Sequence, residues 1–331
     1  MVEIFITILN MSITASIVAL AVMFLRIPLK IAPKVFSYAL WGVVLLRLIL
    51  PFSIESALSL MPAARNMIPL DIVSPNNGVP FGEIPASATA AGYMPAALQV
   101  AESNPGAIAI AIAGYVWLLG FILLIVHALL GYINLRGRIR FATLIEGNIY
   151  EADNIQTPFV LGIIRPKIYF PTNLDPSKHD FILRHEQIHI QRRDYIIKPL
   201  AYIVFALHWF NPLMWVAYFL MSKDMEMSCD EAVLRETNED IRRDYSMSLL
   251  GMSVKRVSLL SPLAFASGES NVKERISNVL RFRRAARRVT VISVIAVAVF
   301  LVGFSSDRVL VIDASHGAGG SSFSINGPIC N

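Results

Sequence analysis

Long apolar runs dominate the pattern of hydrophobic and polar positions along the chain. A membrane-spanning helix needs about 20 predominantly apolar residues. The runs that meet or approach this length are residues 4–25, 35–52, 106–132 and 289–304. Arg47 interrupts the second run near its end, and Arg288 and Asp307 flank the last and shortest run, where they can extend to the two interfaces. The pattern predicts a polytopic α-helical membrane protein with four spans, in which Arg47 also extends to an interface.

A further apolar run, residues 196–221, is broken by polar residues and prolines. The interruptions are Lys198, Pro199, His208, Asn211 and Pro212. Asn-Pro is a turn signal, and a fifth span would move the residues on its two flanks to opposite sides of the membrane. We therefore favour two buried helices that are joined at Asn211-Pro212 and touch the bilayer surface, with a fifth span as the alternative.

Between the third and fourth predicted spans, the pattern changes to short strand-like runs followed by helical periodicity. The strand-like runs are residues 148–151, 157–162 and 167–170, separated by Gly and Pro. Helical patterns continue from about residue 180 onward. The order predicts a single α+β domain with a small sheet ahead of a helical body.

The composition supports a membrane protein. Of the 331 residues, 55% are hydrophobic and only 16% are charged, with a mean hydropathy of +0.57, whereas soluble proteins carry about 25% charged residues. The two cysteines, Cys229 and Cys330, do not make a disulfide framework. The net charge of +5 does not require a nucleic-acid partner, because basic residues also gather on the cytoplasmic face of membranes.

The distribution of basic residues predicts the orientation of the chain. Three of them fill the short link between the first two spans, and a dense basic stretch runs from Arg136 to Arg288, whereas residues 53–105 contain only Arg65. Cytoplasmic loops carry an excess of Lys and Arg. We therefore expect residues 26–34 and 133–288 in the cytoplasm, and both the N-terminus and the C-terminus outside.

The motif that carries chemistry is His185-Glu186-Gln187-Ile188-His189. On a helix, residues i and i+4 share one face, so both imidazoles can reach one ion. Zinc suits imidazole ligands and accepts tetrahedral geometry. Glu186 lies beside the ligand face, where it can act as the general base and return the proton to a leaving amine. The alternative is a helix with exposed histidines.

A catalytic zinc needs a third protein ligand, and Glu226 is the best candidate. Asp230 lies four residues later on the same helical face, where it can accept the N–H of a ligand histidine and fix the tautomer of that histidine. The alternative for this pair is a solvated acidic face. Cys229 points away from the Glu226 face and is expected to be a buried cysteine.

These residues carry a resemblance to a known family. The stretches HEQIHIQRRDY and HWFNPLMWVAYFLMSKDMEMSCDEAVL, with TPFVLGIIRPKIYFP upstream and LAFASGESNVKERI downstream, resemble the antirepressor zinc metallopeptidases of bacterial beta-lactam-resistance signalling. The resemblance implies zinc ligands at His185, His189 and Glu226, and a general base at Glu186. Asp230 resembles the Asp of the Glu-x-x-x-Asp element of thermolysin-like zinc peptidases.

The family's best-known members carry an extracellular penicillin-binding sensor after the last span. Here only 27 residues follow Phe304, without a Ser-x-x-Lys motif, so we do not expect beta-lactam sensing. The expected organisation along the chain is a first span and cytoplasmic link (1–34), a second span (35–53), an extracellular loop (54–105), a third span (106–132), a cytoplasmic zinc metallopeptidase domain (133–288), a fourth span (289–304) and a short extracellular tail (305–331).

Thermolysin-like peptidases hold the substrate backbone against an edge strand, and one run here resembles that strand. The run consists of Thr157, Pro158, Phe159, Val160, Leu161 and Gly162. Its proline favours an edge position, and the alternative is an ordinary structural strand. The next motif after the zinc helix, Arg192-Arg193-Asp194, is expected to form a local ion-pair cluster.

The sequence thus predicts a membrane-embedded zinc metalloendopeptidase with a cytoplasmic protein substrate. By resemblance, this substrate is a transcriptional repressor. The expected partners are the protein substrate and the lipid bilayer. No direct contact with nucleic acid is expected, and a homodimer is possible. The alternatives are a membrane quality-control peptidase with many substrates and a non-catalytic zinc-containing receptor or scaffold.

Resemblance also implies self-processing ahead of the last span. Residues 258–271 are rich in Ser, Pro, Gly and Ala, which is typical of a loop. We expect slow zinc-dependent cleavage near Ala264-Phe265, where Phe265 offers one large apolar side chain to a pocket. The alternative is an uncut connector packed on the domain.

Overall fold

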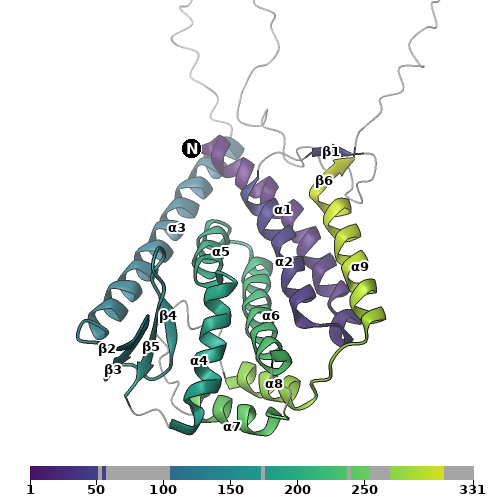
Figure 1. Ribbon diagram of the computed structural model, residues 1–331. Helices are drawn as coiled ribbons and strands as arrows, with labels where there is room; N and C mark the ends of the chain where they lie inside the picture. The colour runs from purple at the N-terminus through teal and green to yellow at the C-terminus, as the bar shows by residue number, and fades with distance from the viewer. Residues whose placement is uncertain (51–53, 57–104, 173–175, 237–239, 254–268, 309–331) are drawn as a thin grey trace, which may run out of the picture.

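The computed structural model describes residues 1–50, 54–56, 105–172, 176–236, 240–253 and 269–308. Most of these residues are helical. The long helices are α1 (Val2–Leu25), α2 (Lys34–Ile49), α3 (Pro105–Arg138) and α9 (Arg287–Ser305), and a short 3-10 helix, η1 (Pro28–Ile31), joins the first two. In Figure 1, α1, α2 and α9 lie on one side of the molecule and α3 on the other, while the small sheet and helices α7 and α8 lie toward the lower end.

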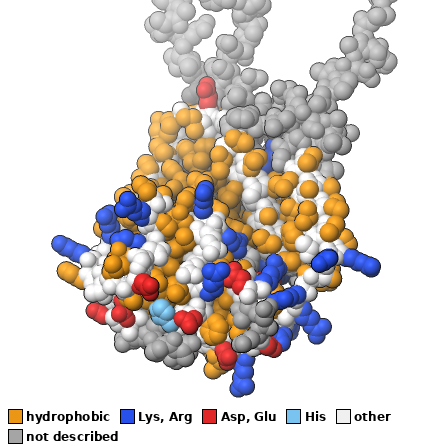
Figure 2. Space-filling view, viewed as in Figure 1, with side chains coloured by type: hydrophobic (Ala, Val, Ile, Leu, Met, Phe, Trp, Pro, Cys, Tyr) orange, Lys and Arg blue, Asp and Glu red, His pale blue; other side chains and the backbone are white. Residues whose placement is uncertain are grey.

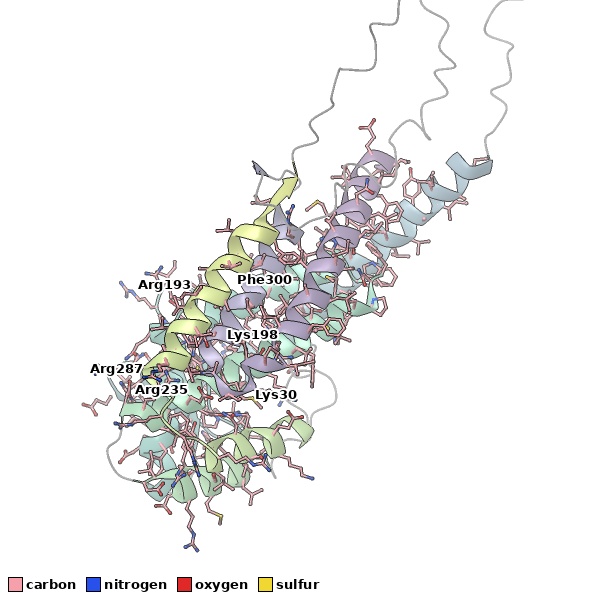
Figure 3. All side chains as sticks on the ribbon, turned by 90° about the vertical axis from the view of Figure 1, so that its right-hand side faces the viewer. Lys30, Arg193, Lys198, Arg235, Arg287 and Phe300 are labelled. Atoms are coloured by element: carbon pink, nitrogen blue, oxygen red, sulfur yellow. The ribbon has the colours of Figure 1, made fainter. Side chains whose placement is uncertain are left out.

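Within the described ranges, three helices are long and apolar enough to cross a membrane, namely α1, α3 and α9. The second predicted span, α2, has 16 helical residues, or roughly 24 Å, which is less than the 30 Å of a typical hydrocarbon core. Apolar side chains cover the part of the surface over the long helices, and charged side chains gather toward the opposite end (Figure 2). Lys30, Arg235 and Arg287 lie at this charged end in Figure 3.

A helical hairpin made of α5 (Asp194–Leu207) and α6 (Pro212–Glu236) lies between α3 on one side and α1 and α2 on the other (Figure 1). The predicted pair of helices joined at Asn211-Pro212 is confirmed. The tip of the hairpin packs against the apolar helices α1 and α3. The Asn211 side-chain amide donates to Ser12 Oγ at 2.9 Å and Ser16 Oγ at 2.7 Å, and Trp117 Nε1 donates to the Leu207 carbonyl at 2.8 Å.

Two apolar cores hold the hairpin in place. The larger one joins α1, α2, α5, α6 and α9, and it contains fully buried Trp41, Phe205 and Met221. The smaller one lies under α4 (Pro176–Gln191), α7 (Arg242–Ser253) and α8 (Glu269–Leu280), around Ile188 and Tyr245. Since α6 contributes to both cores, it links the apolar bundle to the polar end of the molecule.

Arg47 is buried and bonds to the end of α9. Only 6% of this residue is exposed, and its Nε donates to the Phe304 carbonyl at the end of α9 at 2.8 Å. The last carbonyls of a helix lack partners within the helix and carry partial negative charge, so a buried arginine is stabilised there. Beyond this contact, the short strands β1 (Ile54–Ser56) and β6 (Ser306–Arg308) pair in parallel.

The small sheet has the strand order β2-β3-β5-β4. Its strands are β2 (Thr143–Glu146), β3 (Ile149–Ala152), β4 (Phe159–Leu161) and β5 (Lys167–Pro171), and β3 runs parallel to β5 while the other neighbours are antiparallel. The three predicted strand-like runs correspond to β3, β4 and β5. The sequence pattern did not predict β2, because its four residues are all exposed and therefore lack apolar alternation.

Candidate metal centre

Helix α4 presents its two histidines to one point, as the i, i+4 spacing requires. His185 Nε2 and His189 Nε2 lie 3.0 Å apart. The side chains are 6% and 13% exposed, so the imidazole pair is largely shielded from water. Between them in sequence, Glu186 is half-buried, next to the ligand face.

Glu226 on α6 completes a three-residue cluster. Its Oε2 lies 3.5 Å from His185 Nε2 and 3.9 Å from His189 Nε2. Two ligand atoms about 2.1 Å from one tetrahedral zinc ion are roughly 3.4 Å apart, and the three observed separations lie around this value. The donor set of two imidazoles and one carboxylate could therefore hold a zinc ion, and the three atoms lie within 4.8 Å of one another.

A buried network behind His185 orients its imidazole. The His185 Nδ1–H faces the Tyr245 hydroxyl at 2.9 Å, and this hydroxyl donates to Asp230 Oδ1 at 2.7 Å. Asp230 itself lies 3.3 Å from His185 Nδ1. Arg275 on α8 donates to both oxygens of Asp230, at 2.7 and 2.8 Å, and lies 3.1 Å from Glu226 Oε2. The network leaves His185 Nε2 facing Glu226 and His189.

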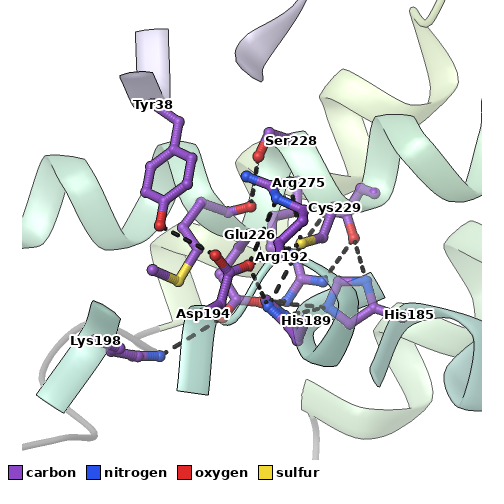
Figure 4. Close-up of polar contacts among 12 residues, drawn as sticks. Tyr38, His185, His189, Arg192, Asp194, Lys198, Glu226, Ser228, Cys229 and Arg275 are labelled. Carbon is purple, nitrogen blue, oxygen red and sulfur yellow. Dashed lines mark hydrogen bonds and ion pairs between the residues drawn. The ribbon is translucent and has the colours of Figure 1, made fainter. Parts of the chain in front are cut away.

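Asp194 orients the imidazole of His189, as Asp230 and Tyr245 orient that of His185. The His189 Nδ1–H donates to Asp194 Oδ2 at 2.8 Å (Figure 4). The chain can bring these residues together because Arg193, between α4 and α5, adopts a left-handed conformation with φ of 60°. A non-glycine residue pays about 1–2 kcal/mol for this conformation, and Asp194 at the first turn of α5 is favoured there by the helix dipole.

Arg275 controls the charge of the acidic residues. Although burial opposes ionisation, Arg275 and His185 hold the pKa of Glu226 and of Asp230 well below its usual range. Burial alone would lower the pKa of His185, but its contacts with Asp230 and Glu226 raise that pKa to about 9. At neutral pH the two carboxylates are therefore ionised, and a metal ion must displace a proton from His185.

Cys229 is fully buried, as expected, but it lies close to the cluster. Its Sγ is 3.4 Å from His189 Nδ1 and 3.5 Å from Asp194 Oδ2. His189, Asp194 and Cys229 thus form a second group of three atoms that could hold a metal ion. Burial raises the pKa of the Cys229 thiol well above its usual value, which disfavours the thiolate that a metal requires. The His185, His189 and Glu226 group fits a metal better.

The run from Thr157 to Gly162 contains β4, and β4 is an edge strand of the four-stranded sheet. It packs beside α4, the helix that carries the two histidines. Gly162 directly follows the strand, with a φ of +115°, and a Cβ added to it would lie 2.6 Å from the Arg165 carbonyl oxygen. Glycine is therefore required at this end of the strand. Ala264 and Phe265 lie outside the described residues.

Four residues of this centre escaped the sequence analysis as participants: Asp194, Lys198, Tyr245 and Arg275. Lys198 Nζ on α5 lies 3.6 Å from Glu226 Oε1. Asp194 was expected in a local ion-pair cluster, and Arg192 Nε does lie 3.8 Å from it, but its nearer partner is His189. Neither spacing nor residue type distinguishes these four from other polar residues of the domain, because they reach the centre from three different helices, α5, α7 and α8.

The sequence of the chain is similar to a known family and to several curated proteins. A sequence model of the BlaR1 peptidase M56 family matches residues 6–279. The regulatory protein BlaR1 of Bacillus licheniformis is 33% identical over 138 residues, 40% of this chain and 23% of that protein. The methicillin resistance mecR1 protein of Staphylococcus aureus is 28% identical over 135 residues, 39% of this chain and 23% of that protein. The aligned part of the chain thus spans about a quarter of the length of these curated relatives.

Proposed function

The chain belongs to the BlaR1 peptidase M56 family, and on that premise we propose that it is a membrane-embedded zinc metalloendopeptidase that acts in regulatory signalling. The observation that carries the proposal is the convergence of His185, His189 and Glu226 at separations suited to one zinc ion, with Glu186 in the same motif. A structural zinc site has four protein ligands. A site of three protein ligands with a carboxylate beside it suits hydrolysis.

Some residues of the site are proposed to bind zinc, and Glu186 is proposed to transfer protons. His185, His189 and Glu226 are the proposed ligands, and Asp230 with Tyr245 orients His185. When bound, zinc supplies Lewis acidity toward a peptide carbonyl and an attacking water. Glu186 takes the proton of this water and delivers it to the nitrogen of the leaving amine.

The proposed substrate is a cytoplasmic protein segment in extended form. An edge strand offers unpaired backbone groups, so a substrate can add to β4 beside α4 by main-chain hydrogen bonds. A transcriptional repressor is the substrate that we propose from the family resemblance. The relative from Bacillus licheniformis is named a regulatory protein, which is consistent with a signalling output.

The test compares purified wild-type protein with its Glu186→Ala and Glu226→Ala variants. We expect bound zinc in the wild type and in Glu186→Ala, zinc loss in Glu226→Ala, and cleavage of an unfolded protein substrate by the wild type only. A wild-type protein that binds no zinc, or equal cleavage by Glu186→Ala, would contradict the proposal. In cells, fragments that disappear in Glu186→Ala identify the substrates and separate one repressor from many quality-control targets.

We also propose that the chain crosses the membrane four times with the metal centre on the cytoplasmic side. The supporting observations are the basic residues at the charged end of the molecule (Figure 2) and the pairing of β1 with β6 at the opposite end (Figure 1). A reporter that is active only in the cytoplasm should be active when fused after Arg140 and silent at Asn331. The reverse result would contradict the orientation.

A further inference from the structure

One face of α2 holds the peptidase helices by three hydrogen bonds to carboxylates. The backbone N–H of Lys34 donates to Glu231 Oε2 at 2.9 Å, the Tyr38 hydroxyl donates to Asp194 Oδ1 at 3.1 Å, and Trp41 Nε1 donates to Asp224 Oδ2 at 2.8 Å. Positions 38 and 41 share one helical face, and Lys34, the first residue of α2, contributes a backbone N–H that has no partner within the helix. The α5–α6 hairpin is therefore docked on α2 through its acidic residues.

Of the three carboxylates in these contacts, only Asp194 also bonds to a proposed zinc ligand. Asp194 receives Tyr38 on Oδ1 and His189 on Oδ2, so its two oxygens join α2 to a proposed zinc ligand (Figure 4). Asp224 also binds Arg26, and Glu231 also binds Asn278 and Arg235. None of these other partners is a proposed ligand, which distinguishes Tyr38 from Lys34 and Trp41.

The geometry of Asp194 depends on both of its hydrogen bonds. Its side chain is 2% exposed, so water has little access to replace a lost donor. The Arg192 guanidinium lies over the Tyr38 ring at 5.0 Å, and its Nε is 3.8 Å from Asp194 Oδ2. Without the Tyr38 hydroxyl, the donors besides His189 toward which the carboxylate can rotate are the Arg192 guanidinium and the Cys229 thiol, whose Sγ is 3.5 Å from Oδ2. This rotation would move Oδ2 away from His189.

We propose that Tyr38 is a positioning residue that acts through Asp194 on His189, so that the placement of α2 against α5 sets the affinity of the centre for zinc. The inference rests on the proposed function, since it assumes that His189 binds zinc. It adds a contact between a helix of the apolar bundle and the metal centre, through which a shift of α2 would alter the protease. Partners of metal-ligating histidines orient the ring and raise its basicity.

The test is Tyr38→Phe in the full-length protein, which removes one hydroxyl and keeps the ring under Arg192. Tyr202→Phe is the matched control, because the Tyr202 hydroxyl bonds only weakly, at 3.4 Å, to the Leu124 carbonyl and has no link to the cluster. Zinc affinity is measured by competition with a chromogenic chelator. We expect Tyr38→Phe to weaken zinc binding by about 3–10-fold, less than the 10–100-fold typical of a direct histidine partner. Tyr202→Phe should bind zinc as the wild type does.

A double-mutant cycle with Asp194→Asn tests the route. If Tyr38 acts through Asp194, then Tyr38→Phe has no further effect on zinc affinity once Asp194 is Asn. Equal zinc affinity of Tyr38→Phe and Tyr202→Phe, or a Tyr38→Phe effect that persists in the Asp194→Asn background, would overturn the inference. A wild-type protein without zinc affinity would instead contradict the proposed function, so the two failures are distinguishable.

Discussion

The two ends of the α5–α6 hairpin are held by different kinds of contact. At the tip, neutral side chains bond to backbone carbonyls and hydroxyls: Trp117 to Leu207, Trp209 to Trp117, and Asn211 to Ser12 and Ser16. At the other end, ionised side chains bond to one another, as in the pairs of Arg26 with Asp224 and Arg275 with Asp230. The same two helices therefore pass from an apolar bundle to a charged network.

This difference follows from what each end must satisfy. The helices break at residues 208–211, which leaves backbone carbonyls without helical partners among apolar neighbours, and neutral donors satisfy them. The opposite end gathers buried acids around the candidate metal centre, and buried charges need ionic partners. We therefore expect substitutions at the tip to change stability, and substitutions at the charged end to change zinc binding and chemistry as well.

The largest expected effect is on chemistry at the charged end. Glu186→Gln should lower kcat about 10²–10⁴-fold, the usual contribution of general acid–base catalysis, because the amide cannot accept the proton of water. Zinc content and the free energy of unfolding should stay close to those of the wild type, since Glu186 is not a proposed ligand. Steady-state cleavage and metal analysis on the same preparation measure both. Zinc loss in this variant would mean that Glu186 is itself a ligand.

Arg275→Met should have the largest effect on stability. It leaves Asp230, which is fully buried, without its bidentate partner, and breaking a buried ion pair costs about 3–5 kcal/mol. Arg184→Met is the control, because the Arg184–Glu236 pair is about 40% exposed on each side chain and such pairs contribute about 0–1 kcal/mol. Denaturant unfolding in detergent measures both variants. Equal effects would show that the network around Asp230 contributes no special stability.

Trp117→Phe should have a smaller effect, confined to stability. The variant removes the N–H that satisfies the Leu207 carbonyl at the tip, and an unsatisfied buried acceptor costs about 1–3 kcal/mol. Zinc affinity should not change, because the tip makes no contact with the ligands. A loss of zinc affinity without a loss of stability would show that the tip and the metal centre are coupled, and it would contradict the proposed difference between the two ends of the hairpin.

Cys229→Ala should have the smallest effect on zinc. Its thiol lies on the Nδ1 side of His189, with Asp194, and not on the Nε2 side where His185 and Glu226 converge. Unchanged zinc affinity by chelator competition would support the His185, His189 and Glu226 group as the metal site. A large loss would favour the alternative group of His189, Asp194 and Cys229.

The sequence by itself determined what depends on local spacing. Apolar runs predicted α1, α3 and α9, and the Asn211-Pro212 turn signal predicted two helices in place of a fifth span. The i, i+4 pairs on α4 and α6 predicted which side chains share a face, and the structure brings His185, His189 and Glu226 together. Helical geometry fixes which side chains of one helix share a face. The meeting of Glu226 on α6 with the two histidines of α4 depends on how these helices pack.

The tertiary structure alone decided which distant side chains meet. Arg47 binds the end of α9, and Tyr38, Tyr245 and Arg275 reach the metal centre from α2, α7 and α8. The sequence separations in these contacts reach 257 residues, for Arg47 and Phe304. The packing of the hairpin against α1, α2 and α3 was likewise not predictable from the sequence, because an apolar helix can bury its side chains against lipid or against other helices with nearly the same pattern. Packing between elements resolves that choice, and it also supplies the buried charge partners that no local pattern encodes.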